Sequence, residues 1–211
     1  EIGDELKELA AAIEEYLSIL ASREKLYGVM REGGFDVVIG NPPYVEYSKV
    51  RSTYSIHGFN TEDSGNLYAF TIERSGVLVD RDGNVGLIVP IAAISVSETA
   101  SVRENIRNGY QATWLSSYAI RPAKLFEGVE QRLTIFLAHK GGDRRTQVLS
   151  TKYHQWYVSE RPYLFDTLAY CPLPFPTDSY PVAKCGSLVA RSALEKLDSA
   201  QGTRAVAWLV G

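Results

Sequence analysis

Residues 35–44 read Phe-Asp-Val-Val-Ile-Gly-Asn-Pro-Pro-Tyr. The short β-branched run at 35–39 does not alternate with polar residues, which is typical of a strand buried on both faces of a sheet. Two prolines cannot continue a central strand, so the chain is expected to leave the sheet there in an extended loop. Ligands of α/β proteins bind at the carboxyl ends of such strands. The stretch therefore predicts an α/β sheet with a ligand site directly after Gly40.

The flanking segments predict a helix before this strand and a long loop after it. Residues 4–32 carry leucine or isoleucine every three or four positions, with glutamate and lysine on the other face, and predict one helix or two helices separated near Ser22. Gly33 and Gly34 end that helix. Residues 45–65 are polar and without period, and long loops in compact domains are often functional.

The rest of the chain alternates strand-length and helix-length segments. A mainly parallel α/β sheet is expected, with helices on both faces and an antiparallel strand near the end. A possible capping box of Ser95 and Glu98 would open one of the helices. The expected elements are helices at 66–79 and 95–109, strands at 85–89, 114–120 and 133–138, a turn at 80–84 and a hairpin strand at 147–151.

Composition excludes several classes of protein. The 211 residues carry a net charge of −3, so a protein that binds nucleic acid over its whole surface is excluded. Residues 1–36 are acidic and residues 121–152 basic, and the basic stretch is either a solvated turn or a phosphate-contacting edge. The longest apolar stretches are too short for a membrane span. Cys171 and Cys185 fit no metal motif, so no metal site is expected. They also form no disulfide framework, so a reducing, cytoplasmic setting is expected.

The Asn41–Tyr44 motif predicts a pocket for an amino group on a planar ring. Because prolines lock the backbone, the Asn41 side-chain carbonyl and the Pro42 backbone carbonyl can be held rigidly as two acceptors for one NH2 group. Tyr44 offers a flat face on which a planar ring can stack. Two acceptors localise the nitrogen lone pair and make that nitrogen a better nucleophile. A nucleobase enters such a pocket only after leaving its duplex.

The motif resembles the catalytic motif of S-adenosylmethionine-dependent N6-adenine DNA methyltransferases of restriction-modification systems. The resemblance covers residues 35–140 well and continues faintly to about 200. It rests also on segments similar to the family's helix and strand starts, at 66–70, 83–90, 102–104 and 124–129. The resemblance implies a partial Rossmann-like methyltransferase fold.

It also implies roles for individual residues. Asn41 and Pro42 would accept from adenine N6, Pro43 would complete the motif, and Tyr44 would stack on the flipped base. Asn41 would also contact the cofactor. Phe126 would pack near the other side of the base, and Arg132 would meet a phosphate, although a core phenylalanine and a solvated arginine are the ordinary interpretations of these two residues.

One departure from the family concerns the cofactor site. The family holds S-adenosylmethionine with a strand, a glycine-rich turn and an acidic residue that precede the motif, and only an amphipathic helix precedes Phe35 here. The chain also starts at Glu1 rather than methionine. We therefore expect the C-terminal half of a catalytic domain that binds cofactor poorly and turns over little by itself. The expected parts are a helical lead-in at 1–34, the catalytic half at 35–152, and a proline-rich linker and helix at 153–211.

The expected partners are double-stranded DNA with a flipped adenine, the missing N-terminal cofactor-binding segment and a C-terminal recognition region, with no membrane. Two alternatives remain open. One is methylation of protein glutamine at N5, or of RNA, because a side-chain amide is also a planar NH2 group. The other is a non-catalytic DNA-binding or scaffold module, which the absent cofactor half makes tenable.

Overall fold

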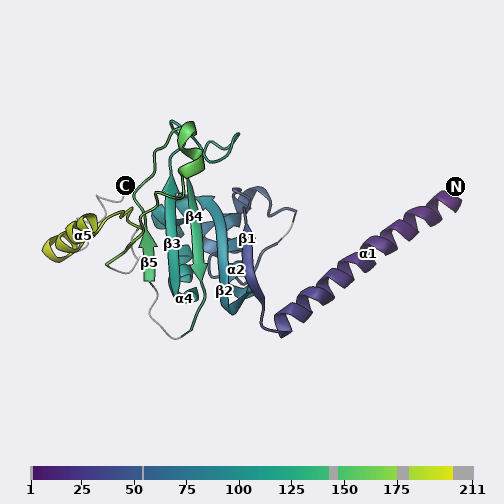
Figure 1. Ribbon diagram of the computed structural model, residues 1–211. Coiled ribbons are helices and arrows are strands. Elements are labelled where there is room, and N and C mark those ends of the chain that lie inside the picture. Colours follow the sequence, from purple (N-terminus) through teal and green to yellow (C-terminus); the bar gives the residue numbers. More distant parts are fainter. Residues whose placement is uncertain (1, 54, 143–146, 175–180, 202–211) are drawn as a thin grey trace.

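The computed structural model describes residues 2–53, 55–142, 147–174 and 181–201. They form a six-stranded sheet of order β1-β2-β4-β3-β5-β6, with helices packed behind it and α1 extending away from it (Figure 1). The strands are β1 (Phe35–Gly40), β2 (Val79–Pro90), β3 (Ala112–Tyr118), β4 (Leu133–His139), β5 (Gln147–Ser150) and β6 (Cys171–Pro172). The α-helices are α1 (Ile2–Arg31), α2 (Leu67–Leu78), α3 (Ala92–Ser95), α4 (Ala100–Gly109) and α5 (Leu188–Gln201). The short 3₁₀ helices are η1 (Tyr47–Lys49), η2 (Glu62–Ser64), η3 (Ser97–Thr99) and η4 (Val158–Tyr163).

The sheet is mixed, with β1, β2, β3 and β5 running one way and β4 and β6 the other. This confirms the predicted mainly parallel sheet with antiparallel strands. The predicted hairpin at 147–151 is wrong, because β5 pairs with β3 in parallel, Ala112 opposite Gln147. Both edges of β4 are already bonded, to β2 and to β3, so no edge is left for a hairpin partner.

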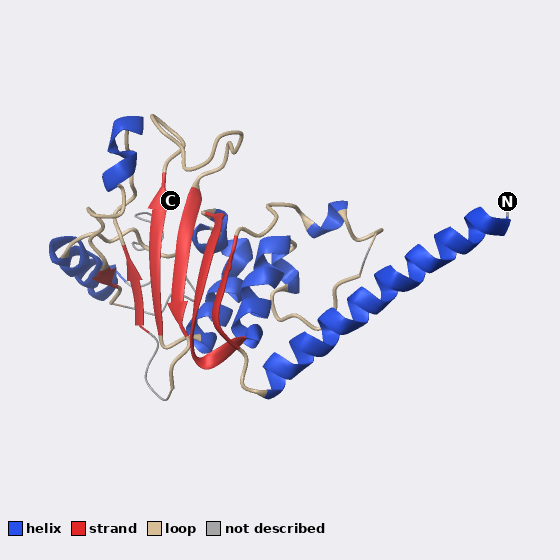
Figure 2. Ribbon diagram, turned by 45° about the vertical axis from the view of Figure 1, so that its right-hand side comes forward, coloured by secondary structure: helices blue, strands red, loops and turns tan. Residues whose placement is uncertain are grey.

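One face of the sheet is covered by α2 and α4 (Figures 1 and 2). The main core lies between these helices and the sheet. It includes Ile72, Leu87, Val102, Ile106 and Phe136. The predicted capping box is wrong. Two short turns, α3 and η3, precede α4, which begins at Ala100. The Ser95 hydroxyl instead accepts a hydrogen bond from Lys184 at 2.8 Å.

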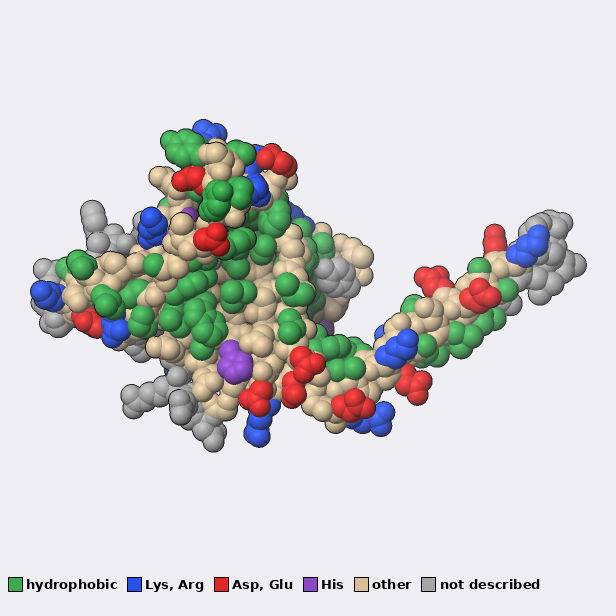
Figure 3. All heavy atoms as spheres, in the orientation of Figure 1, with side chains coloured by type: hydrophobic (Ala, Val, Ile, Leu, Met, Phe, Trp, Pro, Cys, Tyr) green, Lys and Arg blue, Asp and Glu red, His purple; other side chains and the backbone are tan. Residues whose placement is uncertain are grey.

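The opposite face is only partly covered. Around η4, Tyr118, Ala123, Trp156 and Leu164 form a small core above the sheet. Below it, apolar side chains lie open over the strands (Figure 3). Ile39 is 82% exposed, so the prediction that β1 is buried on both faces is wrong. Among the described residues β1 is an edge strand, and only its other face, through Val38, packs against the core.

Two further local expectations differ from the structure. Residues 80–84 lie within β2 rather than in a turn, as an irregular stretch between the pairs Phe35–Val79 and Val37–Asn84. A β-carbon on Gly83 would lie 2.9 Å from the Phe35 carbonyl oxygen, so the two backbones approach too closely for a side chain. The helix α1 is continuous from Ile2 to Arg31, and the Ser22 hydroxyl donates to the Ser18 carbonyl at 2.9 Å within it.

The C-terminal part of the chain returns to the helical face of the sheet. The Val182 amide donates to the Ile94 carbonyl at 2.8 Å, and the Ser187 side chain accepts from the Ala190 amide at 3.1 Å, as expected of a helix cap. The predicted proline-rich linker falls partly on residues 175–180, which lie outside the described residues.

Candidate functional site

The motif stands at the carboxyl end of β1. Gly40 ends the strand, and Asn41 follows with its side chain exposed. Pro42 is buried and Pro43 exposed, so the rigid dipeptide anchors the chain as it leaves the sheet. Because β1 and β2 are parallel neighbours, the loop emerges beside the carboxyl end of β2.

Tyr44 connects the two strand ends. Its single hydroxyl proton is shared between two acceptors, Asn41 Oδ1 at 2.5 Å and the Ile88 carbonyl of β2 at 3.0 Å. Burial raises the pKa of Tyr44, so the hydroxyl keeps its proton at neutral pH and remains a donor. The amide oxygen of Asn41 therefore already accepts one hydrogen bond and has a second lone pair available.

The chain after the motif is bonded to the start of α2. The Leu67 amide donates to the Val45 carbonyl at 3.0 Å, and the Tyr47 amide to the Gly65 carbonyl at 2.8 Å. A buried carboxylate, Glu73, holds the far part of the loop by accepting four hydrogen bonds of 2.9–3.0 Å from the backbone and side chains of Asn60 and Thr61. The described part of the long predicted loop thus includes the short helices η1 and η2 and is bonded to α2 at both of its ends.

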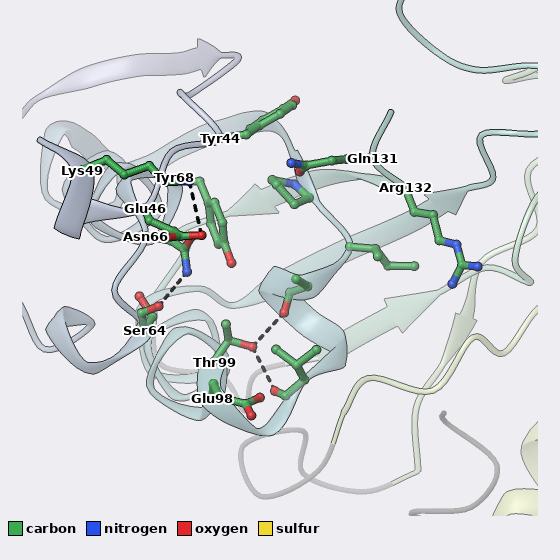
Figure 4. Close-up of a pocket in the computed structure, with 14 residues that line it drawn as sticks. Tyr44, Glu46, Lys49, Ser64, Asn66, Tyr68, Glu98, Thr99, Gln131 and Arg132 are labelled. Atoms are coloured by element: carbon green, nitrogen blue, oxygen red, sulfur yellow. Dashed lines mark hydrogen bonds and ion pairs between the residues drawn. The ribbon is translucent and has the colours of Figure 1, made fainter. Parts of the chain in front are cut away.

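A cleft of about 550 Å³ opens beside Tyr44 (Figure 4). It lies between the motif, the start of α2, the carboxyl end of β2 and the loop that precedes β4. Its lining combines polar and apolar side chains, and Gln131 extends toward Tyr44, whereas the guanidinium of Arg132 points away from it (Figure 4). The lining residues are Tyr44, Glu46, Lys49, Ser64, Asn66, Tyr68, Pro90, Ile91, Ala92, Val96, Glu98, Thr99, Gln131 and Arg132.

The far wall of the cleft is held by a buried arginine. Arg103, 1% exposed, donates to the Val96 carbonyl at 2.6 Å and to the Thr99 hydroxyl at 3.2 Å. Across the cleft, the side-chain amide of Asn66 donates to the Ser64 backbone carbonyl at 2.7 Å. Burial raises the pKa of Tyr68, so it too is a neutral donor. The cleft thus combines neutral hydrogen-bonding groups with charged side chains of both signs.

The predicted site residues are only partly brought together. Tyr44 and Arg132 line one cleft, and Asn41 is bonded to Tyr44 at its margin. Phe126 does not line the cleft but lies half-buried in the loop 119–132 between β3 and β4. Two lining residues were missed as site candidates: Gln131, because a single polar residue outside a motif gives no signal, and Glu98, which was interpreted as part of a capping box. Tyr68, in the segment 66–70 that resembles the family, is buried and also lines the cleft.

The sequence was compared with models of known families. The model described as Eco57I restriction-modification methylase matches residues 2–125, more than half of the chain. The chain belongs to the Eco57I restriction-modification methylase family. The match includes the Asn41–Tyr44 motif and α2. No curated protein sequence matches the chain significantly.

Solved structures of restriction-modification enzymes share the fold. A DrdV–DNA complex is 14% identical, with a TM-score of 0.50, over 68% of this chain and 18% of that one. A nuclease-deletion mutant of the Type ISP enzyme LlaGI with a DNA substrate mimic is 14% identical, with a TM-score of 0.54, over 72% of this chain and 15% of that one. The chain spans less than a fifth of either enzyme.

Two searches of the described residues gave negative results. No group of three or more histidine, cysteine, aspartate or glutamate side chains there could hold a metal ion. No helix in that part of the chain is long and apolar enough to cross a membrane.

Proposed function

We propose that this chain forms part of a DNA methyltransferase that transfers a methyl group from S-adenosylmethionine to N6 of a flipped-out adenine. The observation that carries the proposal is the Asn-Pro-Pro-Tyr motif at the carboxyl end of β1, with Tyr44 beside a polar cleft, in a member of a restriction-modification methylase family. We place the activity in the cytoplasm. The two cysteines are buried free thiols, which agrees with a reducing setting.

In this proposal the motif binds and activates the amino group. Asn41 Oδ1 has one lone pair free beside its bond from Tyr44, and with the Pro42 carbonyl it would accept both N6 hydrogens. Drawing both hydrogens toward acceptors localises the nitrogen lone pair for attack. Tyr44 would give its ring to the base as a stacking surface, and stacking on an aromatic ring is worth about 1–3 kcal/mol. Phe126 and Arg132 are proposed to contact the base's other side and a phosphate.

The described residues fit only part of a cofactor site. Asn41 is exposed at the strand end, where we propose that it also contacts S-adenosylmethionine. When bound, the cofactor supplies an electrophilic methyl group. No glycine-rich turn lies between α1 and β1, where Gly33 and Gly34 form only a helix end. We therefore propose that the isolated chain binds cofactor poorly, which calorimetric titration of the 211 residues would test. A low-micromolar dissociation constant would contradict it.

The uncovered sheet face supports the proposed N-terminal partner segment. Ile39, Gly86, Leu137, Trp114 and Leu149 stand in one row across five strands. Of these, Ile39 and Leu137 are strongly exposed. An exposed apolar patch of this kind marks an interaction site. We propose that the cofactor-binding segment of the parent protein covers this face and that a recognition region follows α5.

Nucleoside mass spectrometry would test the proposed reaction. DNA is incubated with the full-length parent protein and S-adenosylmethionine, with Asn41→Ala as the inactive variant and Asn108→Ala, at an exposed position of α4, as the matched control. N6-methyladenine that disappears only with Asn41→Ala is the expected result. If the parent folds and binds cofactor but methylates RNA or protein glutamine instead, that molecule replaces DNA as the proposed substrate. A parent that binds no cofactor would indicate a non-catalytic module.

A further inference from the structure

The loop 119–132 brings Gln131 and Arg132 to the candidate cleft. It joins β3 to β4, carries Phe126 half-way along, and has no helix or strand of its own. An ion pair within the loop joins Lys124 and Glu130 at 2.6 Å, and bonds to neighbouring segments fix the loop to the rest of the fold. Its last residue is fixed to the end of β2, because the Arg132 carbonyl accepts from the Ile91 amide at 2.8 Å.

The first half of the loop is held by the segment around η4. The Ala119 amide donates to the His154 carbonyl at 2.8 Å, and the Ala123 amide to the Trp156 carbonyl at 3.1 Å. Arg161 of η4 then bonds the two residues that precede Phe126. Its Nη2 donates to the Lys124 carbonyl at 2.9 Å and its Nη1 to the Leu125 carbonyl at 3.3 Å.

Arg161 is itself held in place. Its guanidinium lies 4.9 Å from the ring centroid of Trp156, a side chain only 2% exposed. The η4 turn that carries it is capped, because the Glu160 carboxylate accepts from the Tyr157 amide at 2.6 Å. A planar guanidinium can stack on an indole and bond two successive carbonyls at once, which a lysine ammonium cannot do in the same way.

We propose that Arg161, stacked on Trp156, is a positioning residue that sets the conformation of the loop 119–132 for its contact with the methylated base. This inference rests on the proposed function. Arg161 acts through the loop, and its side chain is exposed, so its replacement leaves neither a cavity nor a buried unpaired charge. The protein is therefore expected to fold without it.

The test uses the full-length parent with a duplex that contains its methylation site. Arg161→Gln is expected to lower kcat/KM for DNA about tenfold, since small displacements of contacting groups can cost up to a hundredfold. It is expected to weaken the fluorescence of 2-aminopurine placed at the target adenine, while cofactor affinity and melting temperature stay unchanged. Arg191→Gln, which changes a half-buried arginine of α5 that pairs with Glu195 far from this loop in the sequence, is the control and is expected to behave as wild type.

The outcomes separate the two proposals. A parent that methylates no adenine overturns the proposed function whatever Arg161 does. A parent that methylates adenine equally well with Arg161→Gln overturns the positioning role alone. If Arg161→Gln lowers the melting temperature, Arg161→Lys provides the test instead. It keeps a cation near Trp156 but cannot donate hydrogen bonds to the Lys124 and Leu125 carbonyls in the same geometry. A stable lysine variant with a several-fold lower kcat/KM supports the role, and wild-type kinetics overturn it.

Discussion

Tyr44 has two separable properties, a ring that faces the cleft margin and a hydroxyl that bonds Asn41 and Ile88. The hydrogen bonds of the hydroxyl hold the motif in place. One of them also uses a lone pair of Asn41 Oδ1, the oxygen that is proposed to accept from the substrate. A net hydrogen bond contributes about 1 kcal/mol, whereas loss of a base-stacking surface costs about 1–3 kcal/mol. The ring is therefore the larger contributor to binding, and the hydroxyl acts mainly on the motif's geometry.

This comparison predicts different effects for two substitutions at Tyr44. Tyr44→Phe keeps the ring and is expected to lower kcat/KM of the parent protein for DNA by less than about tenfold, the equivalent of one hydrogen bond. Tyr44→Ala removes the ring as well and is expected to cost roughly ten- to a hundredfold more. Steady-state methylation of a duplex substrate measures both. Equal losses in the two variants would show that the hydroxyl, not the ring, carries the role.

Among the elements, α2 bonds the far part of the loop 45–65, at Asn60 and Thr61, through one carboxylate. Glu73 accepts four hydrogen bonds, and a glutamine of the same shape would present an NH2 group to one pair of donors. We expect Glu73→Gln to lower the free energy of unfolding of the chain by about 2 kcal/mol, the range for hydrogen bonds to a charged group. Urea denaturation measures this. Glu62→Gln, at an exposed position of the same loop, is the control and should change it by less than about 0.5 kcal/mol.

The segment after residue 180 is bonded to α3 through a lysine whose charge is disfavoured. Burial lowers the pKa of Lys184 to about 8, from 10.5 in an exposed lysine. Because the folded-state pKa is the lower one, the unfolded state binds more protons between pH 8 and pH 10.5, and folding stability rises with pH over this range. The cost of burying the charged ammonium is fully present below pH 8 and is absent above pH 10.5. Wild type should thus gain stability relative to Lys184→Met between pH 8 and 9.5 in urea titrations. Lys25→Met, on exposed α1, should show the wild-type slope.

The elements also show what sequence reasoning can and cannot supply. Periodicity located α2 and α4, and the Asn41–Tyr44 motif located the site, because both signals are local. The partner of β5 was mispredicted, since strand order depends on which edges the rest of the chain leaves free. The capping box failed because the Ser95 hydroxyl is bonded to Lys184, 89 residues away. Gln131 reaches the cleft through a loop that is held by long-range contacts, among them those of Trp156 and Arg161, and no local pattern predicts them.

At the scale of the whole molecule, the two faces of the sheet have unequal cover. The face under α2 and α4 is a closed core, but the other is open below η4, and α1 extends from the sheet with Ile13, Leu17 and Tyr27 also exposed (Figures 1 and 3). A domain that stood alone would bury such surface. The matched part of the chain covers only 18% and 15% of the two solved structures, which agrees with the proposal that other parts of the parent protein cover this face.

That proposal predicts a substitution whose effect depends on the length of the protein. Ile39 is 82% exposed, so Ile39→Asp should change the free energy of unfolding of the 211-residue chain by less than about 0.5 kcal/mol. If the cofactor-binding segment covers this face, the same change in the parent protein removes a buried isoleucine and introduces a charge, which costs about 2 kcal/mol or more. Cofactor affinity should fall with it. Val189→Asp, at an 81% exposed position of α5, is the matched control for an apolar-to-charged change. Equal, small effects of Ile39→Asp in both lengths would mean that the face stays open and that the partner segment binds elsewhere.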